Sequence, residues 1–220
     1  MADARRKTVV LISGRGSNLA ALIGAARGLD YPAEIVLVVS DDPEAGGLDH
    51  AREAGVPFLI IDRKGYVSKL EFEIALDDAM HMAGADLVCL AGFMRLLSEE
   101  FVNAWRDRML NIHPSLLPLF PGLNTHERAL SAGMRLHGAT VHFVRPEMDS
   151  GPIVAQGAVP VLAGDTAATL AARVLTVEHR LYPLALKLVA SGRARAVGDR
   201  VVLNREDPAG PGAALLSPSD

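Results

Sequence analysis

Five short apolar runs that alternate with longer segments of helical period constrain the possible folds of this chain more than any other feature. The runs are rich in Val, Ile and Leu and almost uninterrupted by polar residues, as in strands that are buried on both faces of a sheet. They occupy residues 7–13, 34–40, 57–62, 86–92 and 108–113. The helices between them are expected at residues 17–27, 46–55, 68–83 and 98–107, with Ser68 and Ser98 as the N-caps of the last two. Because parallel strands need such crossovers, the alternation predicts an α/β fold of the Rossmann-like, doubly wound type, with a mostly parallel sheet and helices on both faces.

The second half of the chain departs from this alternation after Gly122. A short helix, two strands around a charged turn, a long helix with a kink at Pro183 and a weak final strand are expected there. Their residues are 125–132, 137–161 with the turn at 145–151, 166–191 and 195–203. No repeat or linker interrupts the chain before its end region, so a single domain is predicted over residues 1–203. The proline-rich residues 204–220 are expected to form a flexible tail.

The composition argues against several classes of protein. Of the 220 residues, 50% are hydrophobic and 22% are charged, which is typical of a globular chain. The net charge of −4 gives no general electrostatic reason to bind nucleic acid. The apolar stretches are too short for a signal peptide or a membrane span, so we expect a cytoplasmic protein that binds neither nucleic acid nor membrane. The single cysteine, Cys89, lies in an apolar run and is expected to be buried and inert.

The stretch SGRGSNL, residues 13–19, lies between the first strand and the first helix. Its two glycines allow the backbone to approach a ligand, and the free N–H groups at the start of the helix attract an anion. A dinucleotide site would use this loop together with Asp41 and Asp42, but Leu19 stands where the third glycine of G-x-G-x-x-G is needed. A single phosphate monoester therefore suits the loop better than a pyrophosphate. A tight turn that binds nothing is the alternative.

The stretch NIHPSLLPLFPG, residues 111–122, places an amide and an imidazole before a loop with three prolines. Proline lacks a backbone donor and fixes φ, so this loop cannot be the interior of a helix or a central strand. The preceding strand should deliver Asn111 and His113 to the carboxyl edge of the sheet, where ligands of parallel sheets lie. Asn111 can donate to a carbonyl oxygen there, and His113 can supply a proton near neutral pH. For an isolated His113, a hydrogen-bonded histidine at a strand end is the better interpretation.

Two further stretches are candidates for the same site. Asp149 precedes Gly151 and Pro152 in RPEMDSGPI, where a carboxylate would orient the imidazole of His113, although spacing alone favours a simple turn residue. The stretch AGFMRLLS, residues 91–98, suits either a flat apolar slot for an aromatic ligand or a helix start that buries its apolar side chains. The remaining histidines show no paired ligand spacing with cysteines or carboxylates, so no metal site is predicted.

Five stretches of the chain together resemble the glycinamide ribonucleotide formyltransferases, a family of folate-dependent enzymes of purine synthesis. They are SGRGSNL, LAGFMRLLS, LNIHPSLLP, VHFVRPEMDSGPI and GDTAATLAARVLTVEH, which occur in order and at the family's separations between about residues 7 and 200. The family transfers the formyl group of 10-formyltetrahydrofolate to the amine of 5-phosphoribosylglycinamide. The resemblance therefore implies a transferase with formyl folate as co-substrate, small-molecule partners, no metal, and a monomeric or homodimeric state.

The resemblance also implies roles for individual residues. Asn111, His113 and Asp149 match the catalytic residues: the first two would stabilise an oxyanion, and Asp149 would hold His113 charged. The residues matched to the nucleotide substrate are Gly16, Ser17 and Asn18 at the phosphate and Glu178 at the ribose. The residues matched to folate are Lys69, Met94, Arg95, Leu96, Leu97, Asn111, Arg145, Pro146, Glu147, Met148 and Asp149. Lys69 stands at a folate-tail position where some members have Arg, and Lys loses bidentate carboxylate binding.

Four alternatives have weaker support. Methionyl-tRNA formyltransferase shares a similar catalytic trio but needs a further C-terminal domain and a basic face, and this chain ends at residue 220. Formyltetrahydrofolate hydrolase has an additional N-terminal regulatory domain, whereas about six residues precede the first predicted strand here. A nicotinamide-dependent oxidoreductase would need the missing third glycine. A non-catalytic phosphosugar-binding protein would have no use for Asn111 and His113.

Overall fold

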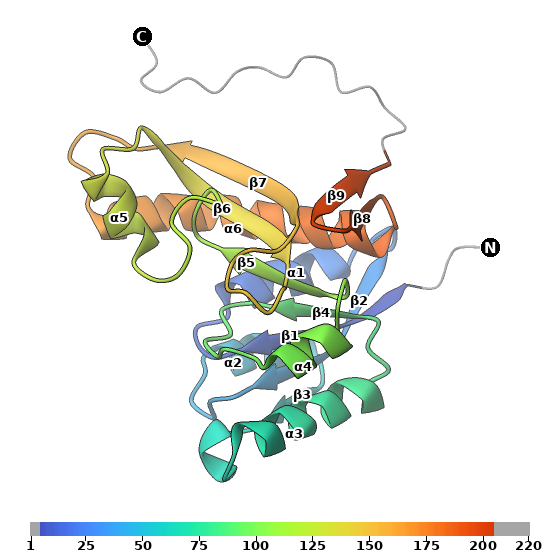
Figure 1. Cartoon of the computed structure of the whole chain (residues 1–220). Coiled ribbons are helices and arrows are strands. Elements are labelled where there is room, and N and C mark those ends of the chain that lie inside the picture. The colour runs from blue at the N-terminus through green and yellow to red at the C-terminus, as the bar shows by residue number, and fades with distance from the viewer. Residues whose placement is uncertain (1–4, 205–220) are drawn as a thin grey trace.

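The computed structural model describes residues 5–204, which contain a seven-stranded sheet (Figure 1). Its strands are β1 (Arg6–Ile12), β2 (Ala33–Ser40), β3 (Phe58–Ile60), β4 (Leu87–Leu90), β5 (Met109–His113), β6 (Leu136–Phe143) and β7 (Ile153–Pro160). They are arranged in the order β3-β2-β1-β4-β5-β6-β7. The strands from β1 to β5 are parallel, while β6 is antiparallel to both β5 and β7. The prediction of a mostly parallel α/β sheet is confirmed.

Helices cover both faces of this sheet (Figure 1). They are α1 (Ser17–Ala26), α2 (Gly47–Ala54), α3 (Lys69–Met82), α4 (Glu99–Ala104), α5 (Thr125–Ser131) and α6 (Ala167–Ala190). Successive residues of β1 enter different cores: Val10 and Ile12 pack with α1, α2 and α6, whereas Val9 and Leu11 pack with α3 and α4. The sheet is therefore buried on both sides, and this explains why its parallel strands are apolar without alternation.

The N-caps predicted for the third and fourth helices are present. The Ser68 hydroxyl accepts a hydrogen bond from the Glu71 N–H at 3.1 Å, and the Ser98 hydroxyl accepts one from the Phe101 N–H at 3.2 Å. α4 is nevertheless shorter than the predicted helix at 98–107. The chain leaves the helix after residue 104 and then turns through Asp107, whose φ of 60° is in the left-handed region.

The weak final strand predicted at 195–203 is a hairpin in the structure. β8 (Ala194–Val197) and β9 (Arg200–Leu203) pair as a separate antiparallel sheet. They are joined through Gly198, which has a φ of 60°. Because glycine adopts this left-handed conformation without steric cost, the chain reverses where a continuous strand was predicted.

The long helix α6 continues through Pro183, so the predicted kink does not interrupt it.

The single-domain prediction for residues 1–203 stays a prediction, and residues 205–220 of the predicted tail lie outside the described part of the chain. None of the helices within residues 5–204 has both the length and the apolar composition that crossing a membrane requires.

The neighbouring strands β1 and β4 mark the point where the winding of the sheet reverses. From β1 the chain moves outward through β2 to β3, then returns to β4 on the other side of β1 and continues to β5. The loop after β1 leads to α1 on one face, and the loop after β4 leads to α4 on the other. Ligands of open α/β sheets bind beyond the carboxyl ends of the strands at such a reversal.

Candidate active site

Asn111, His113, His142 and Asp149 meet beside the carboxyl half of β5. Asn111 and His113 are two positions apart on β5 and therefore share one face of the sheet. His142 lies directly opposite Asn111 on the antiparallel strand β6. Asp149, in the turn between β6 and β7, places one carboxylate oxygen 3.4 Å from His113 Nδ1 and the other 3.8 Å from His142 Nε2. The three residues matched to the catalytic trio are thus brought together.

The conformation of the turn after β6 directs Asp149 at His113. Asp149 has a φ of 55°, and its carboxylate also accepts a hydrogen bond from the Gly122 N–H at 2.8 Å. Two residues later, a Cβ added to Gly151 would lie 1.7 Å from the carbonyl oxygen of Phe143. Only glycine allows the turn to close on β6 at this distance. Asp149 is therefore a turn residue, as its spacing predicts, and also a buried partner of the histidine.

His113 has an oxygen acceptor at each ring nitrogen. Its Nδ1 faces the Asp149 carboxylate, and its Nε2 lies 3.0 Å from the backbone carbonyl oxygen of Phe120, a residue held at a φ of 54°. A carboxylate and a carbonyl both accept hydrogen bonds, so the two contacts are satisfied together when the ring bears two protons. The arrangement can therefore hold an imidazolium next to Asn111.

His142 has the opposite character. Burial lowers its pKa, which favours the neutral ring. Its Nδ1 lies 3.0 Å from the carbonyl oxygen of Phe143, so Nδ1 bears the proton and Nε2 is an acceptor. The Nδ2 atom of Asn111 lies 3.3 Å from this acceptor and donates to it. With one amide proton directed at His142, the carboxamide of Asn111 is held in one orientation and its second proton can serve a ligand oxygen.

The loop at the amino end of α1 has the geometry of an anion site. Gly16 has a φ of 75°, and a Cβ at this position would lie 2.3 Å from the Cα of Gly47, so the start of α2 packs closely on the loop. α1 begins at Ser17 with no side-chain cap, and its first N–H groups are available to a ligand. The Asn18 amide donates instead to the Glu178 carboxylate of α6 at 2.7 Å, and burial raises the pKa of Glu178.

Residues 94–97, matched to a folate slot, follow β4 at the reversal of the sheet. Met94 and Leu96 expose 71% and 72% of their surfaces. Leu97 packs against the core formed with α3 and α4, and Arg95 forms an ion pair with Asp41. Two large apolar side chains in water beside a fixed arginine are consistent with the apolar slot predicted from the sequence.

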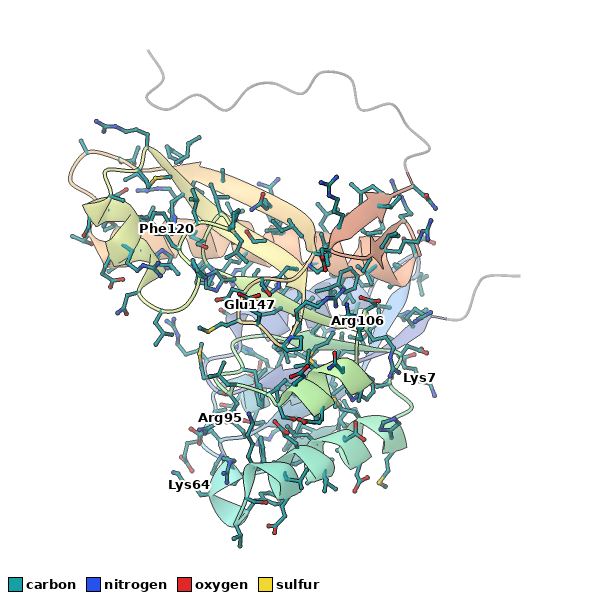
Figure 2. All side chains as sticks on the ribbon, in the orientation of Figure 1. Lys7, Lys64, Arg95, Arg106, Phe120 and Glu147 are labelled. Carbon is teal, nitrogen blue, oxygen red and sulfur yellow. The ribbon has the colours of Figure 1, made fainter. Side chains whose placement is uncertain are left out.

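The other residues matched to folate are more dispersed. In the turn at 145–149, Arg145 donates to Asp107 at 2.5 Å, whereas Pro146, Glu147 and Met148 are exposed. Lys69, the first residue of α3, lies 3.8 Å from the Glu73 carboxylate. That carboxylate also accepts hydrogen bonds from the backbone and hydroxyl of Ser98, which places Lys69 near the end of the 91–98 loop. Figure 2 shows the turn residue Glu147 between Phe120 and Arg95 in this view.

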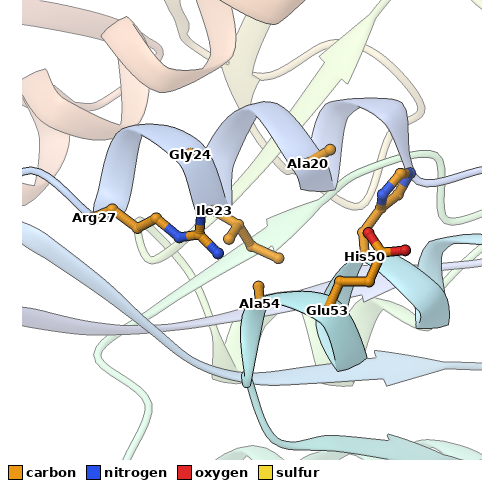
Figure 3. A pocket seen from close by; sticks show the side chains of 7 residues that line it. All are labelled: Ala20, Ile23, Gly24, Arg27, His50, Glu53 and Ala54. Carbon is orange, nitrogen blue, oxygen red and sulfur yellow. The ribbon is translucent and has the colours of Figure 1, made fainter.

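A hollow between α1 and α2 is lined by other residues than those of this site (Figure 3). Its lining consists of Ala20, Ile23, Gly24, Arg27, His50, Glu53 and Ala54, none of which belongs to the predicted site. His50 lies at the end of the hollow that is nearest the start of α1.

Among residues 5–204, no group of three or more His, Cys, Asp or Glu side chains is arranged to hold a metal ion.

Comparison with known protein families matches residues 6–186 to the family described as formyl transferase. Over 187 residues the chain is 45% identical to the phosphoribosylglycinamide formyltransferase of Escherichia coli strain K12, and the match covers 85% of this chain and 88% of that protein. The chain belongs to the phosphoribosylglycinamide formyltransferase family. The resemblance stated from the sequence motifs is confirmed.

Two other relatives of this family member extend the comparison. The crystal structure of phosphoribosylglycinamide formyltransferase from Brucella melitensis is 58% identical, with a TM-score of 0.82, and the match covers 86% of this chain and 97% of that one. The trifunctional purine biosynthetic protein adenosine-3 of Homo sapiens is 50% identical over 188 residues, or 86% of this chain. The chain spans only 19% of the length of that trifunctional protein.

Sequence reasoning missed the residues that hold the proline loop at 114–122. The Thr140 hydroxyl on β6 accepts from the Leu117 N–H at 3.0 Å and donates to the Ser115 carbonyl at 2.7 Å. The Gln156 amide on β7 donates to the Leu117 carbonyl at 2.8 Å and to the Thr140 hydroxyl at 2.9 Å. The available signal was the presence of polar side chains inside two strands, the largely buried β6 and the mostly apolar β7. These contacts fix the loop that carries the Phe120 carbonyl to His113.

Proposed function

We propose that this chain transfers the formyl group of 10-formyltetrahydrofolate to the amine of 5-phosphoribosylglycinamide. The products are formylglycinamide ribonucleotide and tetrahydrofolate, in the synthesis of purines. The proposal depends chiefly on the buried contact of 3.4 Å between His113 and Asp149, next to the oriented amide of Asn111. Membership of the phosphoribosylglycinamide formyltransferase family, with 88% of the Escherichia coli relative covered, supports the same reaction.

The substrate amine attacks the formyl carbon directly. A carbon–nitrogen bond forms, and the electron pair of the carbonyl bond moves to its oxygen. Asn111 and protonated His113 donate hydrogen bonds to this oxyanion, and each such donor contributes ~3 kcal/mol of transition-state stabilisation. For this contact, Nε2 of His113 exchanges the Phe120 carbonyl for the substrate oxygen. Such contacts commonly form only in the substrate complex.

Collapse of the tetrahedral intermediate breaks the bond between the formyl carbon and the folate nitrogen. The leaving nitrogen needs a proton, and the nitrogen that attacked must lose one. His113 gives its proton to the former and receives one from the latter, so the imidazolium is restored and the proton count balances. Asp149 stabilises the charged ring throughout, because its carboxylate faces Nδ1.

The two substrates approach from the two loops at the reversal of the sheet. The nucleotide phosphate binds the N–H groups of Gly16, Ser17 and Asn18 at the start of α1. The side chain of Asn18 is held by Glu178, which brings that carboxylate to the ribose side of the same loop. Formyl folate lies along residues 94–97 and the turn at 145–149, while Lys69 meets a carboxylate of the folate tail.

One assay tests this proposal directly. The protein is mixed with 10-formyltetrahydrofolate, with and without 5-phosphoribosylglycinamide, and folate deformylation is followed by absorbance. We expect turnover only when the amine is present. Deformylation without the amine would identify a formyltetrahydrofolate hydrolase, and no deformylation in either mixture would refute formyl transfer.

A matched pair of histidine variants links the turnover to the site. His113→Ala should abolish most activity, whereas His81→Ala should retain it, since His81 is an exposed residue of α3 that contacts Asp77.

The cytoplasmic location, the monomeric or homodimeric state and the lack of a metal, all inferred from the sequence, stay predictions.

A further inference from the structure

Asp41 is a buried carboxylate that the proposed reaction does not use. It follows β2, and its side chain is 0% exposed. One carboxylate oxygen pairs with Nε of Arg95, whose side chain is 43% exposed, and the other oxygen is buried with no hydrogen-bond partner among residues 5–204. Burying a charge with an unsatisfied oxygen opposes folding, and a buried ion pair is weak support for stability. The contact therefore calls for an explanation other than the stability of the fold.

The partner of Asp41 lies in a loop that has little packing of its own. On either side of Arg95, Met94 and Leu96 hold most of their apolar surface in water. Apolar packing cannot fix side chains that are exposed to this extent. Phe93 and Leu97 pack in or against the core at the two ends of this segment, and between them the chain is anchored by polar contacts: the ion pair of Arg95 with Asp41, and a hydrogen bond of 2.9 Å from the Met94 N–H to the hydroxyl of Ser13.

Both anchors follow parallel strands on the same side of β4: β1, which pairs with β4, and β2, which lies beyond β1. Ser13 directly follows β1 and belongs to the loop matched to the phosphate, while Asp41 follows β2. The guanidinium is planar, and pairing through Nε fixes the direction in which its stem leaves the backbone. The residues on both sides of Arg95 are thereby set in place at the reversal of the sheet.

We propose that Asp41 is a positioning residue for the folate-binding loop at 94–97 and acts through the side chain of Arg95. This inference depends on the proposed function, because it takes that loop as the folate slot. Asp41 has no contact with the reacting atoms, so its effect should appear in the binding of folate and not in the chemical step. Asp41 is thus assigned to folate binding, in contrast to the ribose role that a dinucleotide site would require.

Asp41→Asn tests this role, because it keeps the size of the side chain and removes the charge that holds Arg95. Losing a charge-assisted contact to a half-exposed partner should raise the KM for 10-formyltetrahydrofolate about five- to tenfold. The kcat and the KM for 5-phosphoribosylglycinamide should stay within about twofold. Asp42→Asn is the matched control: within the described residues, the carboxylate of Asp42 accepts one hydrogen bond, from the Glu44 N–H in the next turn, and forms no ion pair.

A second variant separates positioning from a general loss of structure. In an Arg95→Gln background, Asp41→Asn should add less than a twofold further rise in the KM for folate, since the two residues act as a unit. Ser13→Ala removes the other anchor, and it should raise the same KM and speed hydrogen exchange at the Met94 amide. The Ser13→Ala measurements remain informative if Asp41→Asn folds poorly.

The outcomes distinguish the inference from the proposed function. Wild-type protein that transfers no formyl group would overturn the proposed function and this inference with it. An active wild type, with a KM for folate that is equal in Asp41→Asn and Asp42→Asn, would overturn the inference alone. The inference would also be overturned if Asp41→Asn lowered the melting temperature without changing the KM, or if Ser13→Ala left both the KM and the exchange rate unchanged.

Discussion

Replacing Asp149 with Asn isolates the charge that faces His113. An asparagine oxygen can still accept the hydrogen bond from the Gly122 N–H, and Asn tolerates the left-handed conformation that Asp149 adopts. The turn should therefore keep its shape while the ring of His113 loses its carboxylate partner. Asp149→Ala would remove both contacts at once, so it serves as the comparison that reports on the turn itself.

The size of the effect follows from the 3.4 Å between His113 Nδ1 and the carboxylate oxygen. Two unit charges at that separation attract by ~5 kcal/mol with an effective dielectric constant of ~20. The carboxylate charge is shared between two oxygens, and water reaches part of the site, so we retain about half of this value, ~2.5 kcal/mol. If the imidazolium is needed in the transition state, Asp149→Asn should lower kcat by about 70-fold.

Steady-state kinetics with both substrates provide the test, with circular dichroism as a check on folding. We expect kcat to fall by this amount and both KM values to change little. The double variant Asp149→Asn with His113→Gln should lose much less than the product of the single losses, because the two residues act as a unit. A kcat within threefold of wild type, or losses that simply multiply, would refute the role assigned to Asp149.

Three further predictions address the turn, the pH dependence and the phosphate loop. Gly151→Ala should lower kcat at least about tenfold, because its Cβ would meet the Phe143 carbonyl oxygen at 1.7 Å. Gly24→Ala is the control: an added Cβ there would meet no neighbouring group within 4 Å, so this variant should keep full activity and stabilise α1 slightly. Equal kinetics for the two variants would contradict the role of Gly151. Burial lowers the pKa of His137 from 6.5 to about 4, so the folded state favours the neutral ring. The free energy of unfolding should therefore decrease by up to ~3 kcal/mol as pH falls from 6.5 toward 4. Urea unfolding at pH 7 and 4.5 should show a smaller loss for His137→Gln, and an identical loss would exclude the histidine as its source. Asn18→Asp, which puts a second carboxylate near Glu178 and the phosphate, should raise the KM for the nucleotide about tenfold and spare that for folate; a parallel rise in both would indicate structural damage.

The order and type of the elements in the parallel half of the fold could be predicted because the signals there are local. A strand covered on both faces must be apolar along its whole length, and the runs ending at Ile12 and Ser40 show this directly. Ser68 and Ser98 mark helix starts through their own hydroxyl groups. The reversal at Gly198 was missed because a single glycine between two short apolar segments fits a strand and a hairpin equally well.

The contacts within the site could not be predicted in this way, because they join residues that are far apart in the sequence. The amide of Asn18 and the carboxylate of Glu178 are separated by 160 positions, and nothing in either local stretch predicts that they bond. The Phe120 carbonyl at His113 depends on how the proline loop is folded by Thr140 and Gln156. The motif resemblance predicts which residues act in the site, and the structure shows what each of them contacts.

The pairing of β5 with β6 connects the architecture to the chemistry more directly than any other part of the fold. Because β6 is antiparallel, it ends opposite Leu110, near the start of β5, and the following turn must fold back to bring Asp149 to His113. The same pairing sets His142 opposite Asn111 and so orients the amide.

The register of these two strands is therefore part of the geometry of the proposed catalytic site. A slip of one residue would move the side chain of His142 to the other face of the sheet and remove the acceptor that orients Asn111. The pairing of β6 with β7 shifts register between Val141 and His142, beside the catalytic group. Irregularities of this kind bend a strand and redirect its side chains, and they are common next to active sites. The antiparallel edge thus supplies Asp149 to the proposed catalytic trio and orients the amide of Asn111, and neither contact follows from the parallel strands alone.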